Sequence, residues 1–152
     1  GGSGNDVLIG GIGSDTLTGG DGADAFTFEA LDPDDAVTSN ITAAQAGKTG
    51  DKITDFDNDD DILSFLNSAF GNFGTGALNS GNFATITSAY DGTNSEETSG
   101  SKVFIFDSQK TLYFDPATDT DQTANANAGY QVIATFDGNV TISSQDIEIF
   151  NI

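Results

Sequence analysis

Three aspartates recur at intervals of nine residues near the start of the chain: Asp6, Asp15 and Asp24. Each one takes the sixth position of a nine-residue unit that has glycine at its first, second and fourth positions. Glycines permit positive φ angles, so such a unit can form a tight turn whose carbonyl oxygens all point inward. Short carboxylates and carbonyl oxygens are the hard ligands that divalent cations such as Ca²⁺ prefer. The spacing therefore predicts a cation site.

Each unit fits the pattern G-G-x-G-x-D-x-U-x, in which U is a large apolar residue. The units are residues 1–9, 10–18 and 19–27. The three residues after each aspartate predict a minimal strand whose middle side chain faces the core. These middle side chains are Leu8, Leu17 and Phe26.

Two units are expected to make one coil of a parallel β-roll, because each strand runs back across the previous one. The first and third units then stack on the same side, so we expect Asp6 and Asp24 to share an ion. Asp15 lies on the opposite side and needs a partner from the chain after Phe28. A flexible Gly-rich linker is the alternative interpretation, but it leaves the regular placement of the aspartates unexplained.

The composition also calls for a cation. Acidic side chains outnumber basic ones by 24 to 4, which gives a formal net charge of −20. Such an excess works against binding to nucleic acids and to anionic membranes. Self-repulsion opposes compaction, and the first third of the chain is too polar to offset the entropy of ordering it. We therefore expect a bound divalent cation to hold this part folded.

The chain contains no histidine and no cysteine. Their absence excludes most zinc sites, thiolate and disulfide chemistry, and histidine-based catalysis of the protease or lipase kind. A carboxylate pair for glycosidic chemistry stays formally open. We expect a binding and folding module rather than an enzyme.

No stretch reaches the ~20 apolar residues of a membrane-spanning helix, so membrane insertion is not expected. The N-terminus has neither the basic region nor the apolar run of a cleavable signal peptide. The sequence starts without Met inside the repeat array, so we expect it to be the C-terminal fragment of a longer protein.

The array resembles the haemolysin-type calcium-binding repeats of RTX (repeat-in-toxin) proteins. This resemblance implies Ca²⁺ as the cofactor. It also implies that backbone carbonyls of the turn glycines supply most of the remaining ligands. The glycines concerned are Gly2, Gly4, Gly11, Gly13, Gly20 and Gly22.

Residues 51–64 resemble the "DxIxDF…DxIxLS" segment that closes the roll in serralysin-like and other type I secreted proteins. Asp51 and Asp55 are candidates to complete the site of Asp15, although a solvated acidic loop is the alternative for residues 57–61. An EF-hand is excluded there, because its sixth position is Asp60 instead of Gly and its twelfth is Leu66 instead of Glu.

We expect an all-β fold: a short parallel β-roll (residues 1–64, with an inserted loop at about 29–50) packed against a β-sandwich-like cap (65–152). A short helix is predicted at 41–46, and an exposed loop at 91–101. Hairpin turns are predicted at 107–110 and 137–139, and the aromatic residues are assigned to the core. The expected strands are 82–87, 102–106, 111–114, 130–136, 140–142 and 146–152.

Residues 103–115, 131–135 and 146–147 are similar to the C-terminal target domain of type I secreted RTX proteins. Residues 146–152 alternate acidic and apolar side chains, which fits either an uncleaved export signal or a plain terminal strand.

The function expected from these patterns is that of a calcium-binding C-terminal module of a secreted, extracellular protein. Its partners would be calcium ions and the type I secretion machinery during export. It would fold when it meets calcium outside the cell and cap the β-roll. The alternative is a surface-layer, adhesin or matrix module that self-assembles or binds a cell-surface partner in a calcium-dependent way.

Overall fold

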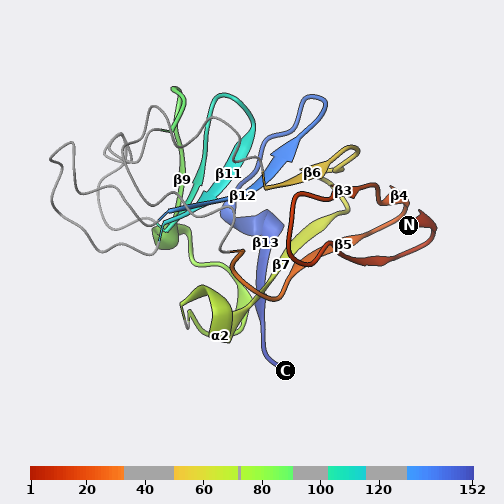
Figure 1. The fold of residues 1–152 in the computed structure, drawn as a ribbon, viewed down its shortest axis with the longest axis horizontal. Coiled ribbons are helices and arrows are strands. Elements are labelled where there is room, and N and C mark those ends of the chain that lie inside the picture. Colours follow the sequence, from red (N-terminus) through yellow and green to blue (C-terminus); the bar gives the residue numbers. More distant parts are fainter. Residues whose placement is uncertain (33–49, 72, 91–102, 116–129) are drawn as a thin grey trace, which may run out of the picture.

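The computed structural model describes residues 1–32, 50–71, 73–90, 103–115 and 130–152 (Figure 1). This part of the chain is almost entirely β structure, so the all-β prediction is confirmed. Its helical elements are short: α2 (Asn67–Phe70), η1 (Ser80–Asn82) and η3 (Ser144–Asp146). None of the helices in these ranges is long and apolar enough to span a membrane.

Most strands belong to two sheets that share one core between them. Sheet I has the order β2-β5-β7-β13-β8 and sheet II the order β3-β6-β12-β11-β10-β9, while β1 and β4 form a separate pair. The strands are β1 (Gly2–Ser3), β2 (Val7–Ile9), β3 (Thr16–Leu17), β4 (Gly20–Asp21), β5 (Ala25–Phe28), β6 (Asp51–Ile53), β7 (Ile62–Leu66), β8 (Gly76–Ala77), β9 (Phe83–Thr85), β10 (Phe104–Phe106), β11 (Thr111–Phe114), β12 (Gln131–Phe136) and β13 (Ile147–Phe150).

The repeat strands stack as a parallel β-roll. In sheet I, Leu8 of the first unit lies opposite Phe26 of the third, and Phe26 lies opposite Leu63 of β7. In sheet II, Leu17 of the second unit lies opposite Ile53 of β6. All these pairings are parallel, which confirms that units one and three stack and that the second unit finds its partner after Phe28.

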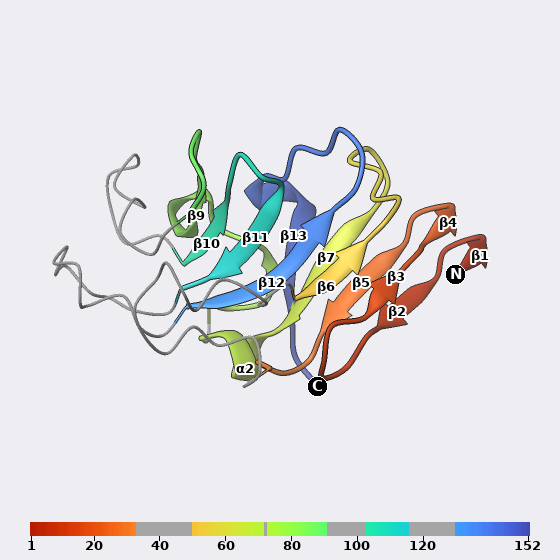
Figure 2. The same cartoon turned by 45° about the horizontal axis from the view of Figure 1, so that its top comes forward.

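The roll continues into the C-terminal part of the chain (Figure 2). Strand β12 pairs in parallel with β6, and β13 pairs in parallel with β7. Strand β7 also spans the predicted boundary at residue 64. Both sheets therefore run without a break from the repeats into the region expected to be a cap, and the division into two domains stays a prediction.

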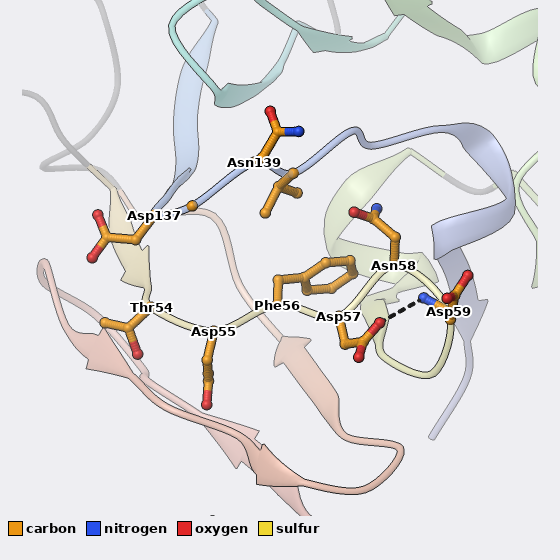
Figure 3. A pocket seen from close by; sticks show the side chains of 10 residues that line it. Thr54, Asp55, Phe56, Asp57, Asn58, Asp59, Asp137 and Asn139 are labelled. Atoms are coloured by element: carbon orange, nitrogen blue, oxygen red, sulfur yellow. Dashed lines mark hydrogen bonds between the residues drawn. The ribbon is translucent and has the colours of Figure 1, made fainter.

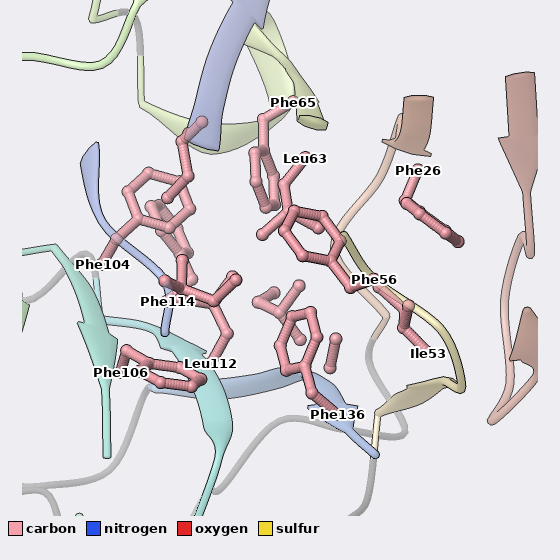
Figure 4. Packing of buried hydrophobic residues seen from close by; sticks show 14 of the residues in the cluster. Phe26, Ile53, Phe56, Leu63, Phe65, Phe104, Phe106, Leu112, Phe114 and Phe136 are labelled. Carbon is pink, nitrogen blue, oxygen red and sulfur yellow. The ribbon is translucent and has the colours of Figure 1, made fainter. Parts of the chain in front are cut away.

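Aromatic side chains connect the array to the C-terminal strands (Figure 4). Phe56 lies between Phe26 of the third repeat and Phe136 of β12, with ring centroids 5.8 and 5.6 Å away. Phe65 of β7 lies 4.8 Å from Phe104 of β10. All five rings are buried, so the core is continuous. The prediction that Phe26, Phe104 and Phe136 are core residues is confirmed.

The predicted turn at 107–110 is confirmed, because it joins β10 to β11 as an antiparallel pair. The predicted strand at 140–142, and with it the hairpin at 137–139, is wrong. Strand β12 already has β11 on one side and β6 on the other, so no edge is free for a further strand. Val140 and Ile142 pack into the core from a loop. The helix predicted at 41–46 and the loop at 91–101 fall outside the described residues.

A second buried cluster lies on the face of sheet II that points away from sheet I. It contains Tyr90, Tyr113 and Tyr130. Successive residues of a strand point to opposite faces of the sheet, so the strands of sheet II contribute side chains to both buried clusters. The buried Asp107 carboxylate accepts hydrogen bonds from the Tyr113 hydroxyl (3.1 Å) and from backbone N–H groups. These N–H groups belong to Tyr90, Gln109 and Thr111.

We expect Asp107→Ala to lower the free energy of unfolding by about 3 kcal/mol, because buried donors lose their acceptor. Urea unfolding in saturating calcium measures the change. Ser108→Ala, at an exposed neighbouring position, is the control and should change stability by less than about 0.5 kcal/mol. Equal stability of the two variants would contradict a structural role for Asp107.

Burial, reinforced by the charge of Asp107, raises the pKa of Tyr113 far above its ordinary value of 10.0. The folded state therefore keeps this proton while the unfolded chain releases it, so stability is lost as the pH rises above about 10. We expect the free energy of unfolding to fall as the pH rises from about 10 to about 12, and to fall less in Tyr113→Phe. Denaturant unfolding at several pH values tests this, and equal slopes for both proteins would contradict it.

Candidate metal centre

Two glycine turns stack directly on each other at one edge of the roll. The first turn (residues 1–6) and the third turn (19–24) are joined through the parallel pair β1–β4. Gly2 N–H donates to the carbonyl of Gly19 at 2.9 Å, and Gly4 N–H donates to the carbonyl of Asp21 at 2.7 Å. The second turn (10–15) lies at the opposite edge, because it connects β2 to β3 in the reverse direction between the sheets.

Glycine is required in these turns for two reasons. Gly4, Gly20 and Gly22 have φ angles of 104°, 105° and 128°, which side chains rarely tolerate. A Cβ atom at Gly20 would lie 2.0 Å from the carbonyl oxygen of Gly2, and one at Gly22 would lie 2.6 Å from that of Gly4. The carbonyls of the first turn thus lie directly against the third turn.

The repeat aspartates form a ladder between coils. Asp24 Oδ1 accepts the N–H of Asp6 at 2.8 Å, and Asp61 Oδ1 accepts the N–H of Asp24 at 2.9 Å. At the opposite edge, Asp51 Oδ1 accepts the N–H of Asp15 at 2.9 Å. Each carboxylate therefore reaches back to the aspartate of the previous coil, which brings the predicted pairs Asp6 with Asp24 and Asp15 with Asp51 together.

Two carboxylate oxygens in this ladder are buried without a hydrogen-bond partner: Asp6 Oδ2 and Asp24 Oδ2. Asp24 is only 1% exposed, so water does not compensate its charge. A Cβ atom at Gly1 would lie 2.4 Å from Asp6 Oδ2, and one at Gly19 would lie 2.3 Å from Asp24 Oδ2. Each oxygen is thus enclosed by its own turn. An uncompensated buried carboxylate is costly, and a cation bound there would remove the cost.

The donor set fits a hard cation that is bound largely by backbone oxygens. Within the described ranges, no group of three or more acidic side chains converges on one point. Ca²⁺ takes six to eight oxygen ligands, including carboxylates and backbone carbonyls. At this site the carboxylates of Asp6 and Asp24 would contribute, and carbonyls of Gly2, Gly4, Gly20 and Gly22 would supply the others.

The opposite edge has the same elements in a less complete form. A Cβ atom at Gly10 would lie 2.6 Å from Asp51 Oδ2 and 3.2 Å from Asp15 Oδ2, so the two carboxylates meet beside this glycine. Gly11 and Gly13 have φ angles of 95° and 103°. The N–H of Gly13 donates to the carboxylate of Asp32.

Asp55 lies at the first edge and not beside Asp15. Its two carboxylate oxygens accept the N–H groups of Gly19 and Gly20, both at 2.9 Å. The position follows from the topology, because the chain crosses from sheet II back to sheet I after β6 ends at Ile53. Residues 55–61, the acidic turn, therefore stack on the third turn.

Sequence reasoning missed Asp61, which ends the acidic turn as Asp6 and Asp24 end theirs. The signal is present in the sequence, since Asp61-Ile62-Leu63-Ser64 repeats the D-x-U-x half of a unit without the glycines before it. Burial raises the pKa of the Asp61 carboxyl, while N–H groups of Asp57 and Asp24 oppose this shift. The nearby charges of Asp24 and Asp55 add to the increase.

An open hollow of about 420 Å³ lies between the acidic turn and the loop after β12 (Figure 3). Asp57 Oδ1 accepts the N–H of Asp59 at 3.0 Å, and Asp55 points away from Asp137 toward the repeat turns. Asp137 forms an ion pair with Lys52 at 2.9 Å, in which both side chains are half-exposed. Such an exposed pair contributes little to stability.

The comparison with known families agrees with this geometry. The family model described as RTX calcium-binding nonapeptide repeat (4 copies) matches residues 1–30. No curated protein matches the chain. The matched residues contain the first, second and third turns, with their positive-φ glycines and stacked aspartates. Residues 1–30 are therefore RTX calcium-binding nonapeptide repeats, and calcium is the ion that they bind.

Proposed function

We propose that this chain is the calcium-dependent folding module of a secreted, extracellular protein exported by a type I system. The observation that carries this proposal is the pair of buried, unpartnered oxygens Asp6 Oδ2 and Asp24 Oδ2 between stacked glycine turns. Without a cation, these carboxylates oppose the closure of the first coil on the next one. The first coil would therefore stay open where free calcium is scarce.

The charge of the chain strengthens this dependence. A formal charge of −20 disfavours compaction, and the ladder places carboxylates one coil apart along both edges. Bound calcium supplies the positive charge that compensates these groups. Extracellular calcium modules typically have dissociation constants of ~10⁻⁴ to 10⁻³ M, which suits a switch between cytoplasm and exterior. An ion that binds only the folded state stabilises it in proportion to the logarithm of its concentration.

The C-terminal strands support a capping role within this proposal. Strands β12 and β13 cover the edges of β6 and β7 that would otherwise remain unpaired. Phe136 and Ile147 extend the core that begins at Phe26. An apolar C-terminal part of this kind would fold by hydrophobic burial and offer the repeats an edge on which to stack.

We propose a binding role rather than catalysis for these residues. The chain has no histidine or cysteine, and the hollow beside the acidic turn is open and lined by acidic side chains. The acids there serve as hydrogen-bond acceptors or ion-pair partners of the fold itself.

One observation favours a second candidate, a module that self-assembles at a surface or in a matrix. Strands β2 and β3 are the end strands of their sheets within the described residues. Val7, Ile9 and Ile12 nearby are 70%, 51% and 78% exposed. Apolar side chains beside an open strand edge favour pairing with a further strand, from another repeat or from another chain.

We expect calcium, but not magnesium, to increase the β-structure signal in far-UV circular dichroism of the chelated protein. Asp24→Asn keeps the acceptor for Asp6 N–H but removes the unpartnered charged oxygen, so it should weaken calcium binding by more than about tenfold. Asp21→Asn has the same change in charge at an exposed position of the same turn and should bind almost as wild type. Identical spectra in chelator and in calcium would contradict calcium-dependent folding.

For the second candidate, light scattering should show a particle mass that grows when calcium is added. Ile9→Lys should keep the particle monomeric, because a charge at an exposed edge strand opposes pairing. Ser68→Lys, which is exposed on α2, adds the same charge far from the edge and should leave assembly unchanged. A monomeric mass for the wild type at every calcium concentration would rule this candidate out.

A further inference from the structure

The third turn is held by two carboxylates on the side that faces the acidic turn. Asp55 accepts the N–H groups of Gly19 and Gly20, which begin the turn. Asp61 accepts the N–H of Asp24, which ends it. Both ends of the turn are thus fixed by side chains from a different segment, 35 to 37 residues further along the chain.

All four oxygens of these two carboxylates accept backbone N–H groups. The second oxygen of Asp61 accepts the N–H of Asp57 at 2.9 Å. The corresponding oxygens of Asp6 and Asp24 have no partner. At Asp61, the N–H of Asp57 therefore occupies the position that stays open in the two repeat aspartates. The contrast separates carboxylates that need a cation from carboxylates that already have donors.

From this contrast we propose that Asp55 and Asp61 are positioning residues of the calcium site and not calcium ligands. They hold Gly19, Gly20 and Asp24 in the bound conformation before calcium arrives, so the third turn serves as a template for the first. The inference rests on the proposed calcium-dependent folding. The third turn is then the half of the calcium site that is formed before calcium binds. The half that waits for calcium is then the first turn.

The physical basis is the cost of ordering a glycine turn. Glycine loses more conformational freedom on folding than any other residue, and the third turn contains three. Carboxylates that accept N–H groups form charge-assisted hydrogen bonds, which are about twice as strong as neutral ones. Burial of Asp61 makes its bonds more effective, whereas Asp55 is exposed and should contribute less.

The first test measures calcium binding to the full chain by isothermal titration calorimetry. Asp61→Asn should weaken the affinity by about tenfold and Asp55→Asn by a smaller factor, both with an unchanged number of bound ions. Asp60→Asn, exposed in the same acidic turn, carries the same charge change and should bind as wild type. Asp24→Asn, which changes a proposed ligand, should weaken the affinity by more than about tenfold.

Terbium luminescence in H₂O and D₂O separates positioning from ligation, because its lifetimes report the number of water molecules on the ion. Asp55→Asn and Asp61→Asn should leave that number unchanged, whereas Asp24→Asn should raise it. A lost ion or an added water in Asp61→Asn would overturn the proposal, and so would an affinity equal to that of Asp60→Asn. Asp55→Asn, at the exposed position, keeps the test available if Asp61→Asn does not fold.

Amide exchange in chelator gives a reading that does not depend on bound metal. The N–H groups of Gly19, Gly20 and Asp24 should be protected in the wild type and lose protection in the two positioning variants. The N–H groups of Gly4 and Asp6 should become protected only when calcium is added. Fast exchange at Gly19, Gly20 and Asp24 would overturn this inference alone, while protection at Gly4 and Asp6 in chelator would contradict the proposed calcium-dependent folding.

Discussion

Stacked carboxylates are the constraint on which this structure depends. A parallel roll places equivalent residues of successive coils about 4.8 Å apart, so an aspartate in each unit produces a column of like charges along each edge. Asp24, Asp51 and Asp61 are buried in these columns. Every such carboxylate needs compensation by a cation or by N–H donors, and the type of compensation decides how each part of the roll folds.

The groups that compensate the stacked carboxylates change along the chain. In the repeats, the glycine turns bring carbonyl oxygens and the enclosed carboxylates close together. Two of these carboxylate oxygens accept no hydrogen bond. In the acidic turn, the N–H groups of Gly19, Gly20, Asp24 and Asp57 satisfy Asp55 and Asp61. The roll therefore passes from a part with unpartnered carboxylate oxygens, where we propose that bound calcium is needed for folding, to a part whose carboxylates accept backbone N–H groups. Both sheets continue through this junction.

The burial of apolar side chains also increases along the roll, from the first unit toward the C-terminal strands. The core-facing Leu8 of the first unit is only partly buried, whereas the core-facing Phe26, Ile53 and Leu63 of the following strands are almost completely buried. Phenylalanines from β7, β10, β11 and β12 fill the space between the sheets in the C-terminal part. Hydrophobic burial is thus weaker in the first unit, the part that we propose to fold only with bound calcium.

The nine-residue spacing alone determined the roll, the stacking of units one and three, the direction of Leu17 and Phe26, and the pairing of Asp6 with Asp24, because strand period and turn length are local properties. The sequence also indicated Asp51 and Asp55 as candidate partners of Asp15, and Asp51 is the one that lies beside it. Only the tertiary structure decided that Asp55 lies at the first edge, that Asp61 continues the ladder, and that residues 140–142 form no strand. These outcomes depend on which sheet edges are already occupied and on the direction in which the chain crosses between the sheets, and both are set by contacts between segments far apart in the sequence.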